Sequence, residues 1–118
     1  MIEALDWRPA ALDRGGSVPE LFRVGPSVVD RRTGDVATPI GKQRLRAKEL
    51  ELLKHLYEHV RRTFTREELL QLVWNCAPNL VTRTVDQTVA TLRKKIELDP
   101  ERPRFVQTVY GIGYRLVL

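Results

Sequence analysis

The segment from Thr82 to Ile96 has the clearest helical pattern in the chain, because its apolar side chains recur every three or four residues. These side chains form one stripe that we expect to be buried: Val85, Val89, Leu92 and Ile96. The opposite face carries small polar and basic residues, namely Arg83, Gln87, Ala90, Thr91 and Lys94. Thr84 followed by Gln87 three residues later predicts a capping box, and Thr82 is a competing cap.

Two further helices are predicted upstream of this segment. The first should run from about Ala47 to His59, and five residues are expected to lie on or beside its buried stripe: Leu50, Leu53, Leu56, Tyr57 and Val60. The second opens with Thr65-Arg66-Glu67-Glu68, a capping box that places acids at the positive end of the helix dipole. Its inward-facing residues are expected to be Leu69, Leu72 and Val73, with Trp74 closing the core.

Short strands are predicted on both sides of the helices. Three of them, separated by turns at Gly25-Pro26 and Thr33-Gly34-Asp35, should form a small antiparallel sheet: Leu21–Val24, Ser27–Asp30 and Val36–Thr38. Residues 39–44 form a longer approach to the first helix, to which no strand is assigned. After the last helix, two prolines precede a hairpin of Phe105–Val109 and Tyr114–Leu118 that turns at Gly111 and Gly113. A helix followed by such a ribbon predicts an α+β winged helix-turn-helix.

Several motifs in this order make the chain similar to the DNA-binding output domain of OmpR/PhoB-type response regulators, over about Leu21 to Leu118. The motifs are Leu45–Leu53, Thr65–Leu70 with Val73-Trp74, Arg83–Asp86, Leu92–Ile96 and Gln107–Arg115. The resemblance implies a bacterial-type regulator of transcription, in a two-component system, that binds double-stranded DNA sequence-specifically. The predicted helix would enter the major groove, and the wing would lie on the backbone or minor groove.

This resemblance and the helical pattern together nominate DNA-contacting residues. They are Arg83, Thr84, Gln87, Thr88, Ala90, Thr91, Lys94, Thr108, Tyr110 and Gly111. We expect Gln87 and Thr91 to contact base edges, and Arg83, Lys94 and Thr108 to hold the backbone. By the same resemblance, the loop before the last helix could face RNA polymerase through Asn75, Pro78 and Asn79. Leu80 and Val81 in that loop could instead complete the core.

The sequence also departs from the family pattern. Many relatives carry arginine at the position of Thr91 and at the wing tip, where this chain has Tyr110. Arg46 and Ala47 replace a threonine cap and a proline at the start of the first helix, which removes a side-chain acceptor usually worth ~1 kcal/mol. A winged-helix module for protein contacts, without specific DNA binding, therefore remains the alternative function.

Charge is distributed unevenly along the 118 residues, which suffice for one domain. The net charge is +5, but residues 1–40 hold five basic against six acidic side chains, and residues 41–118 hold fifteen against nine. The basic part thus coincides with the predicted DNA-binding part, as expected where phosphates must be neutralised. We expect residues 1–20 to be a linker or irregular arm and residues 21–118 to be the winged-helix domain.

Other chemistry has little support in the sequence. The segment His55-Leu56-Tyr57-Glu58-His59 matches an inverted zinc-protease signature, but no third ligand or substrate-binding half is evident, so neither a metal, a cofactor nor an enzyme is expected. Cys76 alone excludes an internal disulfide and is read as a small loop filler rather than a redox sensor.

No signal peptide or apolar run of the ~20 residues needed to span a membrane is present, which predicts a soluble, cytoplasmic protein. Without a heptad seam, the isolated chain is expected to be a monomer that binds tandem half-sites. The rival is a dimer formed by the N-terminal arm through Trp7.

Overall fold

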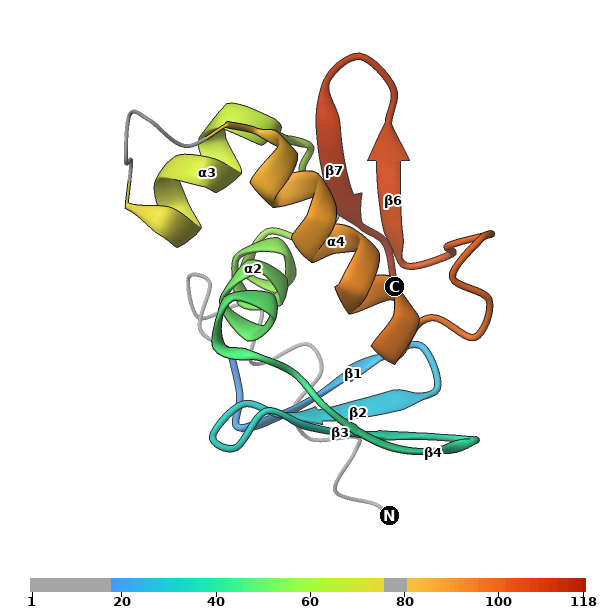
Figure 1. Cartoon of the computed structure of the whole chain (residues 1–118). Coiled ribbons are helices and arrows are strands. Elements are labelled where there is room, and N and C mark those ends of the chain that lie inside the picture. Colours follow the sequence, from blue (N-terminus) through green and yellow to red (C-terminus); the bar gives the residue numbers. More distant parts are fainter. Residues whose placement is uncertain (1–17, 76–80) are drawn as a thin grey trace.

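The computed structural model describes residues 18–75 and 81–118. In it, three helices lie between an N-terminal sheet and a C-terminal hairpin (Figure 1). This arrangement confirms the predicted winged-helix architecture. The expectations for most of the N-terminal arm with Trp7, and for Cys76, Pro78 and Asn79, lie outside the described residues.

The N-terminal sheet has four antiparallel strands in the order β1-β2-β3-β4, one more than predicted. The strands are β1 Leu21–Val24, β2 Ser27–Asp30, β3 Asp35–Thr38 and β4 Gly41–Arg44. All four β4 residues are exposed, so this edge strand lacks the apolar alternation that revealed the others. Strand β4 forms because it pairs with β3 across a two-residue turn, although the sequence predicted no strand in residues 39–44.

The helical layer consists of α2 Ala47–Glu58, α3 Arg66–Trp74 and α4 Arg83–Ile96. The apolar stripe of α4 is fully buried as predicted, whereas on the other two helices Leu52 was missed and the inward placement of Leu72 is wrong. Leu52 is completely buried on α2 while Leu50 and Val60 are only half-buried, because α2 packs against α3, α4 and β7 and buries a broad arc. Leu72 is 41% exposed, and Trp74 packs at the edge of the core rather than inside it.

The three helices begin in different ways. Thr65 caps α3 as predicted: its hydroxyl accepts from Glu68 N at 3.0 Å, and Glu68 Oε1 accepts from Thr65 N at 2.8 Å. The capping box predicted at Thr84 is wrong, since α4 already begins at Arg83 and Thr82 makes no side-chain cap. A tight turn bonds the first N–H groups of α4 to the carbonyls of Val81 and Thr82 instead.

The wing comprises β6 Val106–Val109, β7 Gly113–Leu116 and the turn between them. A short strand that was not predicted, β5 Phe64–Thr65, pairs with β7, so the hairpin belongs to a three-stranded sheet in the order β5-β7-β6. This close pairing explains Gly113: a Cβ there would lie 1.9 Å from the Phe64 carbonyl oxygen. The wing is thereby attached to the strand that leads into α3.

Candidate nucleic-acid interface

One side of α4 is open to solvent along its whole length, next to the wing (Figure 1). Opposite the buried stripe, five exposed residues form a continuous surface that we call the α4 face: Arg83, Gln87, Ala90, Thr91 and Lys94. The helical period therefore placed these side chains correctly. Thr84 and Thr88, two further candidates, flank this surface and are half-buried.

The ends of the α4 face carry cations that are available to an anionic ligand. Within the described parts of the chain, neither Arg83 nor Lys94 forms an ion pair or a side-chain hydrogen bond. The other two basic residues of α4 are occupied: Arg93 donates to the wing, and Lys95 donates to Glu49 at 2.8 Å. Exposed cations without internal partners can neutralise phosphates at no cost in internal contacts.

Threonine hydroxyls near the centre of α4 are bonded within the helix. Thr88 Oγ1 donates to the Thr84 carbonyl at 3.0 Å, and Thr91 Oγ1 donates to the Thr88 carbonyl at 3.0 Å. Gln87 makes no side-chain hydrogen bond to the residues that the structure describes, so both its amide donor and its acceptor face outward. The capping role considered for Gln87 is therefore not observed.

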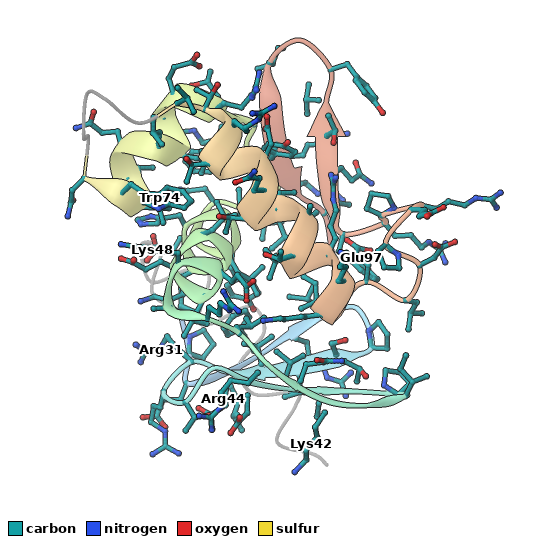
Figure 2. All side chains as sticks on the ribbon, viewed as in Figure 1. Arg31, Lys42, Arg44, Lys48, Trp74 and Glu97 are labelled. Carbon is teal, nitrogen blue, oxygen red and sulfur yellow. The ribbon has the colours of Figure 1, made fainter. Side chains whose placement is uncertain are left out.

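A groove runs along the side of α4 that faces away from the wing. It is lined by α2 and α3 residues Arg46, Ala47, Lys48, Glu49 and Trp74, and by α4 residues Thr84, Gln87, Thr88 and Thr91. Figure 2 shows Lys48 and Trp74 together on this side, where the Lys48 Nζ donates to the Val73 carbonyl at 2.9 Å. The lysine thus neutralises the negative end of the α3 dipole at the rim of the groove.

The floor of this groove holds Glu49, a carboxylate that is only 3% exposed. Its burial raises the pKa, but hydrogen bonds from Lys95, Thr91 and the Arg46 backbone together lower it below the ordinary 4.5. The Arg46 N–H bond, 2.8 Å to Glu49 Oε1, is one half of a capping box. The other half is missing, since a guanidinium cannot accept a hydrogen bond. Glu49 therefore satisfies the Arg46 N–H group, while the side-chain acceptor that a threonine would supply at the start of α2 is absent.

Asp86 connects α4 to α3 and the wing. Its carboxylate accepts from Arg66 Nη2 at 2.6 Å and Nε at 3.1 Å, and from the Tyr114 hydroxyl at 2.7 Å. Burial raises the pKa of Asp86, but these bonds and the charges of Arg66 and Arg83 hold it below the ordinary 3.8. Burial, with a contribution from Asp86, raises the pKa of Tyr114 to about 12, so the phenol remains a donor.

The wing presents its predicted contact residues at different depths. Tyr110 at the turn is 89% exposed, and Gly111 next to it has a φ of 80°, a conformation that favours glycine. Thr108 is half-buried, and its hydroxyl accepts from Arg93 Nη2 at 2.8 Å. Arg93 also donates to the Val106 carbonyl at 3.0 Å, so α4 holds the wing strand at a fixed distance.

A second link between α4 and the wing was missed in the sequence. Glu97, 6% exposed at the end of α4, accepts hydrogen bonds from the backbone N–H groups of Arg104, Phe105 and Val106 at 2.8 to 3.3 Å (Figure 2). In the sequence, Glu97 does not differ from nearby acids such as Asp99 or Glu101, which are exposed. Glu97 is distinguished only in the structure, where the loop after α4 folds back onto the end of that helix.

The remaining candidate motifs behave differently. Asn75 is exposed and ends α3 in a left-handed conformation with φ 57°; Pro78 and Asn79 lie outside the described residues. In the inverted zinc-protease signature, α2 ends at Glu58, so His59 is no longer helical, and His55 lies 3.9 Å from Glu58. Among the described residues, no group of three or more potential metal ligands is present, and no helix is long and apolar enough to cross a membrane.

Comparisons with known proteins agree with this geometry. The family model described as "Transcriptional regulatory protein, C terminal" matches residues 41–116. The chain is similar to response regulator DrrB, an OmpR/PhoB homologue from Thermotoga maritima, with 31% identity and a TM-score of 0.76 over 98% of this chain and 52% of that one. This chain thus spans about half the length of DrrB.

Two solved domains are matched over most of their own length. The DNA-binding domain of Bacillus subtilis CssR shares 32% identity with a TM-score of 0.61, over 70% of this chain and 90% of that one. The DNA-binding domain of response regulator AdeR was solved in complex with an intercistronic region. It shares 28% identity with a TM-score of 0.63, over 85% of this chain and 100% of that one.

Proposed function

This chain belongs to the family of transcriptional regulatory protein C-terminal domains, the DNA-binding domains of OmpR/PhoB-type response regulators, and we propose how it binds double-stranded DNA sequence-specifically. The α4 face enters the major groove, and the wing lies on the adjacent backbone or minor groove. This family is one of transcription regulators rather than of enzymes.

The observation that carries this proposal is the composition of the α4 face. It has uncommitted cations at both ends, Arg83 and Lys94, and small side chains at its centre that allow a close approach to base edges. Gln87 offers both a donor and an acceptor, the combination that adenine requires in the major groove. The AdeR domain, of similar fold, is bound to an intercistronic region.

Base readout and backbone contact are separated by two substitutions. After selection of a preferred duplex from random sequences, Gln87→Ala should reduce affinity for that duplex by ~1 to 3 kcal/mol and relax the base preference. Lys94→Ala should weaken all duplexes alike and lower the slope of log affinity against log salt by about one. Fluorescence anisotropy on selected and scrambled duplexes measures both effects.

Two results would contradict this assignment. Equal losses on selected and scrambled DNA for both variants would show that Gln87 does not read bases. Failure of the unmodified chain to prefer any duplex, at low and moderate salt, would favour the alternative of a winged-helix module for protein contacts.

Assembly on tandem half-sites is the second part of the proposal. Residues 21–118 are the binding unit, residues 1–20 are a linker or arm, and the free chain is a monomer. Adjacent half-sites about one helical turn apart then bring two domains together, so duplexes with two sites should bind more tightly than duplexes with one. Sedimentation at tens of micromolar, with and without residues 1–19, tests the monomer. A dimer lost on truncation would instead assign the arm as an interface.

Contact with RNA polymerase and a cytoplasmic location complete the proposal. Asn75 is exposed at the end of α3, which makes it accessible to a protein partner. Alanine at Asn75, Pro78 and Asn79 should leave DNA affinity intact and reduce transcription in a reconstituted assay. Unchanged transcription would rule out this surface. A domain that binds chromosomal DNA in a bacterium acts in the cytoplasm.

A further inference from the structure

Thr91 lies at the centre of the α4 face, yet its hydroxyl proton is used inside the protein. Oγ1 donates to the Thr88 carbonyl at 3.0 Å. Thr91 also lines the groove together with Glu49, and its hydroxyl contributes to lowering the pKa of that carboxyl. A hydroxyl has one proton, and the bond to the Thr88 carbonyl keeps that proton away from the solvent side of α4.

This bonding limits what Thr91 can offer to a base. With its proton engaged, the side chain cannot donate to the O6 or N7 of guanine or the O4 of thymine. The other branch at Cβ is the methyl group Cγ2, carried by a side chain that is exposed. Ala90 beside it adds a second methyl group to the α4 face.

The major groove displays one apolar group that matches such a surface, the C5-methyl of thymine. Within the DNA-binding function proposed above, we infer that Thr91 determines specificity by its methyl group and that its ligand is duplex DNA with a T·A pair opposite the centre of α4. Gln87, one helical turn earlier, supplies the polar part of the readout.

The test combines two side-chain variants with the removal of one methyl group from DNA. On the selected duplex, each thymine is replaced singly by deoxyuridine, which keeps all hydrogen-bonding groups and lacks only the C5-methyl. Thr91→Val keeps the methyl and removes the hydroxyl, whereas Thr91→Ser keeps the hydroxyl and removes the methyl. Thermal unfolding of each variant checks that it is folded as stably as the unmodified chain.

We expect one position at which deoxyuridine weakens binding of the unmodified chain by about fourfold, the value for burying one methyl group. Thr91→Val should keep this sensitivity and bind the thymine duplex within about twofold of the unmodified chain. Thr91→Ser should bind the thymine duplex about fourfold more weakly and should no longer distinguish uracil from thymine at that position.

The opposite pattern would overturn the inference. If Thr91→Ser binds like the unmodified chain and Thr91→Val loses affinity, the hydroxyl is turned outward in the complex and reads the base. Selective binding that is indifferent to deoxyuridine at every position would also refute methyl readout while leaving the proposed function intact. Loss of all sequence preference in the unmodified chain would instead refute the proposed function.

Discussion

Replacement of Glu97 by glutamine should destabilise the domain more than any other single-atom change near the wing. The carboxylate is buried and holds three successive backbone N–H groups with its two oxygens. In Glu97→Gln one oxygen becomes an NH₂ group, so a donor faces donors, and at least one buried N–H group loses its acceptor.

The size of the effect follows from these bonds. An unsatisfied buried donor costs about 1 to 3 kcal/mol, and hydrogen bonds to a charged acceptor are roughly twice as strong as neutral ones. The neutral amide is easier to bury, which offsets part of the loss. We therefore expect the free energy of unfolding to fall by about 2 to 4 kcal/mol, out of a total of about 5 to 15 for a domain of this kind.

Urea denaturation followed by circular dichroism measures this change. With a slope of about 2 kcal/mol per molar urea, the midpoint should fall by about 1 to 2 M at an unchanged slope. Glu101→Gln is the matched control, because Glu101 lies exposed in the same loop and should change stability by less than about 0.5 kcal/mol. Equal midpoints for the two variants would mean that the carboxylate does not hold the wing.

Three other predictions follow from the fold. The pKa values of Glu49 and Asp86 are lowered in the folded chain, so the stability that these carboxylates contribute is complete above the ordinary values of 4.5 and 3.8 and is lost as the pH falls below them. Urea midpoints measured from pH 6 to pH 3 should therefore decrease, and a flat profile would contradict this. Thr65→Ala should cost about 1 kcal/mol and Thr82→Ala much less, because only the first threonine caps its helix; similar costs would refute the assignment. Gly113→Ala should shift the β5–β7 pairing and lower the melting temperature by several degrees, since the new Cβ meets a β5 carbonyl oxygen, whereas an unaltered melting temperature would show that the backbone can move.

The sequence by itself determined the elements that have a strong local signal. The stripe on α4 predicted which residues are buried and which form the α4 face, because a helix with one buried side repeats every 3.6 residues. The Thr65–Glu68 capping box was equally readable, since its hydrogen bonds join residues three apart in sequence. The pattern of motifs identified the family.

Only the tertiary structure decided features that depend on distant neighbours. Strands β4 and β5 exist through pairing with β3 and β7, and neither has an apolar alternation of its own. The arc buried on α2 is set by how many elements surround it, which is why Leu52 rather than Leu50 lies in the core. Glu97 holds the wing and Glu49 pairs with Lys95 because chain segments remote in sequence meet there, and such contacts leave no periodic signal.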